Sequence, residues 1–144
     1  MLSALPVIPH DSRAKVVGVG YSAEYAAKWG RWQSRYTRPA EKLGVVFITG
    51  THAMGGINTA VERELNQPTP NKIVARTLYT IGQGFKVAVE AALMTADQGF
   101  LPLKKEVLAL GGTGAGADTA LILNPVASTE FFKLRIREIV CLPR

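Results

Sequence analysis

The sequence predicts an α/β protein with three layers, in which helices cover both faces of a mixed, mostly parallel sheet of about five strands. Short runs of β-branched residues alternate along the chain with longer segments of helical periodicity, which is typical of α/β layering. The first runs are apolar and end in glycine, as buried parallel strands do. The later strands lie too close together in the chain for a parallel crossover, so we expect a C-terminal antiparallel hairpin.

The individual elements follow from the same patterns. Apolar residues at steps of three and four trace the face of a long helix, which Gly82 and Gly84 are expected to split into two packed helices. The expected strands are Lys15–Gly20, Val45–Thr49, Glu106–Leu110, Thr119–Leu123 and, toward an edge of the sheet, Leu134–Leu142. The expected helices are Ala23–Trp29, a helix opened by Pro39 and closed by Gly44, a turn or two at Thr59–Leu65, the long pattern Val74–Ala96, and one turn capped by Ser128.

The composition indicates one domain over residues 1–144. Apolar residues make up 47 % of the chain and charged residues 19 %, which favours a packed core over disorder. No run approaches the roughly 20 consecutive apolar residues that span a bilayer, and the start of the chain is not typical of a signal peptide. The single cysteine, Cys141, excludes a disulfide within the chain and is expected in the core of a cytoplasmic protein.

Several segments of the sequence follow the pattern of one known protein family. They are Gly84-Phe85-Lys86-Val87-Ala88-Val89-Glu90, Met94-Thr95-Ala96-Asp97-Gln98-Gly99, Val107-Leu108-Ala109-Leu110-Gly111-Gly112, Gly116-Ala117-Asp118-Thr119-Ala120, the ending 138–144, and the loop 51–56 with His52 and Gly56 in place. With these segments the chain resembles the stand-alone form of the pyruvate kinase C-terminal (α/β) domain. The resemblance extends over nearly the whole chain from Lys15 onward.

The resemblance implies that domain's fold and a binding or regulatory role. It implies no pyruvate kinase activity, because in pyruvate kinase the phosphoryl-transfer site lies in other domains, and this chain has no Gly-x-x-x-x-Gly-Lys-Ser/Thr loop. The family usually opens with a further strand, loop and helix, of which residues 1–9 can supply at most the tail. A sheet without that strand offers an open edge to a second copy, so a homo-oligomer is expected.

The strongest candidate for a ligand site is the loop between the two hairpin strands. Its glycines let backbone N–H groups turn toward an anion without a Cβ in the way, and its threonines add hydroxyl donors. A flexible hairpin turn is the alternative interpretation. The candidate residues in this loop are Gly111, Gly112, Thr113, Gly114, Gly116, Asp118 and Thr119.

A second candidate loop follows the strand Val45–Thr49, at the kind of strand end where ligands bind in open α/β sheets. His52 can donate to a phosphate there. No carboxylate or serine partner for His52 stands out in the sequence, so catalysis by His52 is a minor alternative. The other alternative is a loop histidine that only makes hydrogen bonds to nearby backbone groups. The candidate residues are Thr49, Gly50, Thr51, His52, Gly55 and Gly56.

A third feature is a basic and aromatic stretch with Lys28, Trp29, Arg31, Trp32, Arg35, Tyr36, Arg38 and Lys42. The favoured interpretation of this stretch is a solvated basic face. One alternative is a lid over an anionic ligand, and another is a surface that stacks on bases or on a flavin ring. On the long helix, Glu90 is expected to make a buried hydrogen bond and Asp97 to anchor the helix end or a neighbouring loop. No residues have metal-ligand spacing.

These observations predict a non-catalytic binding or regulatory domain with a pocket between the two loops. The net charge of +6 permits an anionic partner and does not choose between a phosphorylated ligand and nucleic acid. The expected ligand is a phosphorylated small molecule, of which flavin mononucleotide (FMN) is one form, and nucleic acid is not expected. A structural or regulatory oligomeric subunit is the alternative. An enzyme of unknown reaction that uses His52 is the third.

Overall fold

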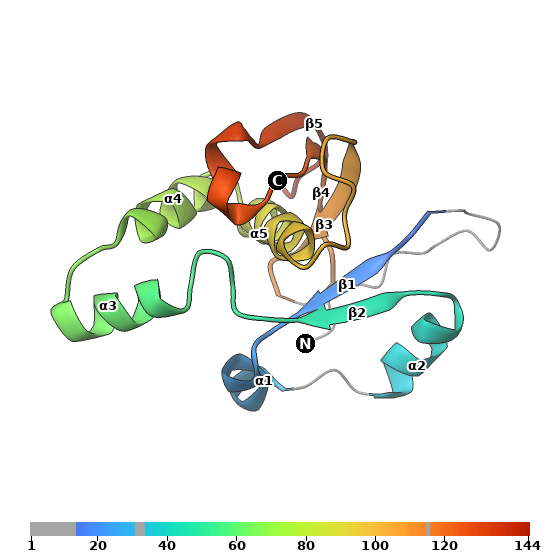
Figure 1. Ribbon diagram of the computed structural model, residues 1–144, viewed down its shortest axis with the longest axis horizontal. Coiled ribbons are helices and arrows are strands. Elements are labelled where there is room, and N and C mark those ends of the chain that lie inside the picture. The colour runs from blue at the N-terminus through green and yellow to red at the C-terminus, as the bar shows by residue number, and fades with distance from the viewer. Residues whose placement is uncertain (1–13, 31–33, 115) are drawn as a thin grey trace.

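The structure is a computed structural model that describes residues 14–30, 34–114 and 116–144. It is a mixed α/β fold, as predicted, and Figure 1 shows its arrangement. In chain order the elements are β1 (Val17–Gly20), α1 (Ala23–Trp29), α2 (Ser34–Lys42), β2 (Val46–Thr49), α3 (Ile57–Leu65), α4 (Pro70–Tyr79), α5 (Gln83–Asp97), β3 (Val107–Gly111), β4 (Thr119–Asn124), the 3-10 helix η1 (Ser128–Lys133) and β5 (Arg135–Cys141).

The strands form two sheets, which corrects the prediction of one mostly parallel sheet. Among the described residues, β1 and β2 make a parallel pair in which Val17 lies opposite Val46, and β3, β4 and β5 make an antiparallel sheet in that order. The predicted hairpin and the edge position of β5 are confirmed. The helices α1 and α2 join β1 to β2 and allow a parallel crossover, whereas the short connections after β3 and β4 leave no room for one.

The core lies between α5 and the antiparallel sheet. Phe85, Val89 and Leu93 of α5 pack with Leu121 and Leu123 of β4, and all five side chains are buried. The opposite face of the sheet carries Leu108, which is 61 % exposed. The described residues therefore give this sheet two layers rather than the predicted three.

Helix α5 approaches β3 closely because both elements carry small residues at the contact. A Cβ built on Gly111 would collide with the carbonyl oxygen of Gly84 and would lie 2.7 Å from the backbone nitrogen of Ala88. A Cβ on Gly84 would likewise collide with the side chains of Asp118 and Thr119. The predicted break in the long helical pattern is confirmed, since α4 ends at Tyr79 and α5 begins at Gln83.

Four local expectations have mixed outcomes. Gly44 ends α2 with a left-handed φ of 85°, as predicted, but Pro39 lies inside α2 and does not open it. Ser128 makes no side-chain cap, because Ala127 takes the N-cap position of η1. Cys141 is exposed rather than in the core, since it lies on the edge strand β5.

No helix in the described ranges has both the length and the apolar character needed to cross a bilayer.

We predict that Gly111→Ala lowers the free energy of unfolding by about 2–3 kcal/mol, because the added methyl must push the backbone of α5 away from β3. Gly114→Ala is the matched control in the same hairpin, since a Cβ there meets nothing within 4 Å, and its effect should stay below about 1 kcal/mol. Urea unfolding measures both. Equal effects at the two positions would contradict the close packing of α5 on β3.

Candidate functional site

The carboxyl ends of β1 and β2 lie side by side, because the parallel register pairs Gly20 with Thr49. The chain leaves β1 into Tyr21 and α1, and it leaves β2 into the loop 50–56 that carries His52. In open α/β sheets this is the place where ligands bind. The strand ends therefore bring together residues that are about 30 positions apart in the sequence.

An aromatic cluster forms at this point. The ring centroid of His52 lies 5.0 Å from that of Tyr25 and 5.9 Å from that of Tyr21. Tyr25 stacks on Trp29 at 4.7 Å, because residues four apart share one face of α1, and Tyr21 meets Trp29 edge-on at 5.2 Å. Trp29 is 45 % exposed. The cluster thus runs from a half-buried imidazole out to an exposed indole.

A buried ion pair lies beside this cluster. Lys86 and Glu90 are one turn apart on α5, both are buried, and the ammonium of Lys86 donates to Oε2 of Glu90. The other carboxylate oxygen, Oε1, accepts a hydrogen bond of 3.0 Å from the backbone N–H of Met54. The expected buried hydrogen bond of Glu90 is therefore confirmed. Lys86 was not singled out in the sequence, although a Lys–Glu pair four residues apart within an apolar helix is a usable signal.

The protonation of His52 depends on this surrounding. Burial lowers the pKa of His52 below its ordinary value of 6.5. The carboxylate of Glu90 acts against this shift and the ammonium of Lys86 adds to it, so both charges act on the imidazole. The neutral imidazole is the favoured form at neutral pH, and it offers one N–H donor and one acceptor.

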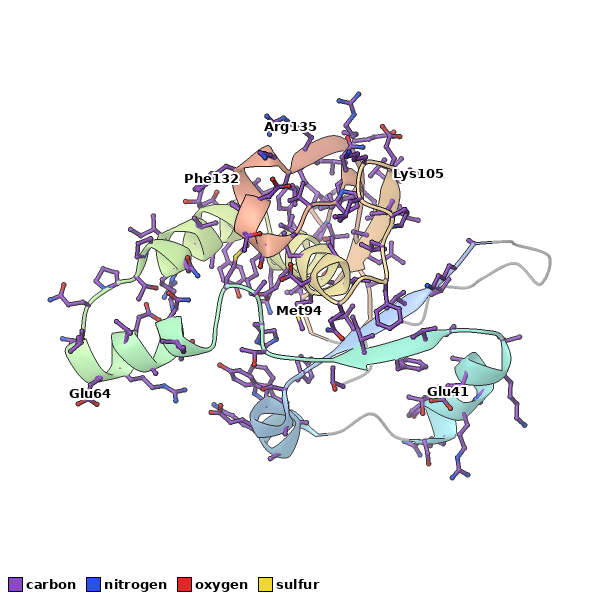
Figure 2. All side chains as sticks on the ribbon, viewed as in Figure 1. Glu41, Glu64, Met94, Lys105, Phe132 and Arg135 are labelled. Atoms are coloured by element: carbon purple, nitrogen blue, oxygen red, sulfur yellow. The ribbon has the colours of Figure 1, made fainter. Side chains whose placement is uncertain are left out.

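The loop 50–56 is held along α5 and then turns into α3. Gly50 lies beside Met94 and Gln98, whose nearest atoms would be 3.7 Å and 3.5 Å from a Cβ on the glycine. The N–H of Gly55 donates to the carbonyl of His52 at 2.9 Å, and Gly56 has a left-handed φ of 62° at the start of α3. Figure 2 shows Met94 close to the path of this loop.

The hairpin loop 111–119 already contains an anion of its own. The carboxylate of Asp118 accepts from the backbone N–H of Thr113 at 2.9 Å and from the hydroxyl of Thr119 at 2.8 Å. These hydrogen bonds, with Thr113 contributing most, lower the pKa of Asp118 below its ordinary value. The donors that were expected to face a phosphate are therefore directed at a carboxylate of the same loop.

The structure does not bring the two predicted loops together. The hairpin loop meets α5 at Gly84, near the start of the helix, whereas Met54 meets it at Glu90 and Gly50 meets it at Met94 and Gln98. Ten residues along a helix span about 15 Å, and six residues also turn the contact by about 120° around the axis. The candidate site is therefore the aromatic cluster and the loop 50–56, without the hairpin loop.

The basic stretch divides into two helices, α1 and α2, so it does not form one continuous stripe. Lys28 lies 5.9 Å from the ring centroid of Trp29, and the guanidinium of Arg35 lies 4.6 Å from the ring centroid of Tyr36. The stretch 31–33, with Arg31 and Trp32, falls outside the described residues. Asp97 accepts from the N–H of Ser128 at 2.7 Å, which confirms that it anchors the end of α5 to a neighbouring segment.

Fold and site together define a small mixed α/β protein with an aromatic and histidine cluster at the ends of its parallel strands. No protein-family model matches the sequence. In the described ranges, no three side chains among His, Cys, Asp and Glu gather as a metal ion would require.

We predict that acid weakens the fold through His52. Its pKa is lower in the folded chain than in the unfolded chain, so the unfolded chain binds this proton more tightly, and stability falls as the pH drops below about 6.5 toward the folded-state pKa. The stability of His52→Gln, measured by urea unfolding between pH 5 and 7.5, should depend less on pH than that of the wild type. An NMR titration that places the pKa of His52 above 6.5 would contradict this.

A second prediction concerns the buried ion pair. Glu90→Gln keeps the shape of the side chain but leaves Lys86 as a buried unpaired charge, so it should lower the free energy of unfolding by about 3 kcal/mol. Adding Lys86→Met removes that charge, and the double variant should be more stable than Glu90→Gln alone. If chemical denaturation shows that the two single effects add, Lys86 and Glu90 do not act as a pair.

Proposed function

We propose that this chain is a non-catalytic binding protein of the cytoplasm, and that its ligand is a small molecule with a phosphate group and a planar ring. The observation that supports this is the juxtaposition of Tyr21, Tyr25 and His52 at the carboxyl ends of β1 and β2. These rings come from two separate segments, and they meet at the edge where α/β folds bind ligands.

The ring-binding part of the proposal rests on Tyr25 and Trp29. Their stacked pair lies on α1, and the indole retains 45 % of its exposure, so an aromatic face is accessible to a planar molecule. Stacking of this kind contributes about 1–3 kcal/mol per ring and does not depend on hydrogen-bond readout. A flavin ring is a suitable planar group, which makes FMN the probe of choice.

The phosphate-binding part rests on the loop 49–56. The hydroxyls of Thr49 and Thr51 are on exposed residues, and the neutral imidazole of His52 has one N–H to donate. Within the described residues, the backbone N–H groups of Thr51 and His52 donate to no other protein group, whereas that of Met54 is engaged by Glu90. Glu90 is thus a positioning residue that holds the loop in place.

The hairpin loop has a smaller part in this proposal than the sequence indicates. The carboxylate of Asp118, a half-buried residue, occupies the N–H of Thr113 and the hydroxyl of Thr119, so a phosphate there would meet a negative charge. A role for this loop would require Asp118 to release both donors. The experiment below separates the two loops.

We predict that FMN binds in isothermal titration calorimetry and that riboflavin, which lacks the phosphate, binds more weakly. Tyr25→Leu should raise the Kd for FMN by about tenfold or more through the lost stacking, and His52→Ala should do the same through the lost N–H donor to the phosphate. Tyr36→Leu is the matched control, because Tyr36 lies on α2 and contacts Arg35 instead of the cluster.

Two results would contradict the assignment of this site. The first is the absence of binding by FMN and by inorganic phosphate at millimolar concentration. The second is a Kd that changes in Asp118→Asn but not in Tyr25→Leu, which would place the ligand at the hairpin loop instead.

A structural or regulatory role through self-association is the second candidate function. It is favoured by large apolar side chains that remain exposed on α3, with Ile57 at 82 % and Leu65 at 61 % exposure. This role needs no ligand and is compatible with the first.

A further inference from the structure

Helices α3 and α4 form an arm that extends from the rest of the fold. We call residues 57–79 the helical arm. In Figure 1 it reaches away from α5 and from both sheets, with α3 as its outer part. No residue of α3 is buried, and α4 buries only Ala75. A nine-residue helix that buries nothing is marginal by itself, because most helical stability in proteins comes from packing.

One face of α3 has the pattern of a packed helix but lacks a partner. The residues of this outer stripe follow one another at helical steps of three and four. They are Ile57, Ala60, Val61, Glu64 and Leu65. Ile57 is 82 % exposed and Leu65 is 61 % exposed, although apolar residues at this spacing are typical of a buried face.

Most of the outer stripe points away from the arm's own second helix. The residue of α3 that faces α4 is Glu62, whose carboxylate accepts from the ammonium of Lys72 at 2.9 Å. Glu62 lies 100° to 160° around the helix from Ile57, Ala60, Val61 and Glu64, but 60° from Leu65, and Val61 is half-buried. Ile57, Ala60 and Glu64 are thus the part of the stripe that points away from α4. This part is therefore free to contact another molecule while the arm keeps its internal ion pair.

The arm also contains a hollow. Its volume is about 450 Å³. Ile73, Arg76 and Thr77 of α4 line it together with Thr80 at the end of that helix, at steps of three and four, and Pro68, Lys72 and Glu62 of α3 complete the lining. Ile73 is 59 % exposed. In the described part of the chain Arg76 makes no ion pair, in contrast to its neighbour Lys72. The hollow thus combines exposed Ile73 and the unpaired guanidinium of Arg76 with the ion pair of Lys72 and Glu62.

We propose that the outer stripe of one copy of this chain binds in the hollow of a second copy, and the reverse, in a two-fold symmetric dimer. Glu64, which also has no ion pair among the described residues, would lie opposite Arg76 of the other copy. From Ile57 to Glu64 and from Ile73 to Thr80 the chain advances seven residues, about 10 Å each, so stripe and hollow match in length. A two-fold axis makes both contacts at once.

The second copy is a better occupant than an unrelated acidic helix because the chain itself supplies both complementary parts. The stripe carries the unpaired carboxylate and the hollow carries the unpaired guanidinium, and each is flanked by exposed isoleucine. The contact involves none of the residues of the aromatic cluster, so it can hold or fail independently of ligand binding.

Charge reversal tests the proposal in sedimentation velocity experiments on the full chain. The wild type should be a dimer at micromolar concentration. Glu64→Arg and Arg76→Glu should each raise the dimer Kd at least tenfold, because each places two like-charged pairs in the dimer. An equimolar mixture of the two variants should recover the dimer, since both reversed positions then face an opposite charge. Glu41→Arg is the control, because Glu41 lies on α2, away from the arm, as Figure 2 shows.

A variant that does not rely on charge completes the test. Ile57→Asp should also give a monomer, and circular dichroism should show an intact fold because the wild-type side chain is 82 % exposed. A wild type that stays monomeric at 200 µM would overturn the proposal. So would a dimer that neither single reversal weakens, or two weakened variants whose mixture remains monomeric.

Discussion

The carboxylate of Glu90 connects the two halves of this molecule, the parallel pair with its following loop and the antiparallel sheet with α5. It lies on α5, which packs on the antiparallel sheet, and it accepts the N–H of Met54 from the loop that follows the parallel pair. Because this carboxylate is buried, the attraction of the Lys86 ammonium beside it offsets part of the free energy of removing it from water. Loss of either partner affects the position of the loop 50–56, and with it the place of His52 next to Tyr25.

Helix α5 can serve both halves because its faces differ in chemistry. Toward the hairpin it presents Gly84 and Ala88, which allow backbone to approach backbone, and the main-chain atoms of α5 lie where a Cβ of Gly111 would be. On other faces it presents Lys86 and Glu90, which are polar and satisfied within the fold. Helix α5 therefore packs closely on the antiparallel sheet because Gly84 and Ala88 have small side chains or none, and it holds the loop 50–56 through the carboxylate of Glu90.

Local structure was largely predictable from the sequence, and the arrangement of the sheets was not. The bounds of α1, the break before α5 and the hairpin of β3 and β4 follow from periodicity, glycine positions and loop length, which are properties of neighbouring residues. How many strands join one sheet depends on contacts between distant segments. The sequence predicted helices on both faces of one sheet, but α5 covers only one face of the antiparallel sheet, and Leu108 on the other face remains 61 % exposed. Cys141 was misjudged for the same reason, because an apolar neighbourhood in sequence does not bury an edge strand.

The candidate site shows where residue type stops being informative. His52 stood out as a histidine after a strand, but Tyr21 and Tyr25 join it only because β1 and β2 pair in parallel with Gly20 opposite Thr49. The glycines of the loop 111–119 indicated an anion site equally well, and the anion they accommodate is Asp118 of the same loop. A glycine-rich turn frees its backbone donors for any acceptor within reach. An acceptor in the same loop, such as Asp118 directly before β4, binds these donors at a smaller entropic cost than a ligand from solution. A carboxylate inside such a turn therefore argues for internal closure. The loop 50–56 has no carboxylate of its own, and Glu90 of α5 engages the N–H of Met54, so the N–H groups of Thr51 and His52 have no protein acceptor within the described residues.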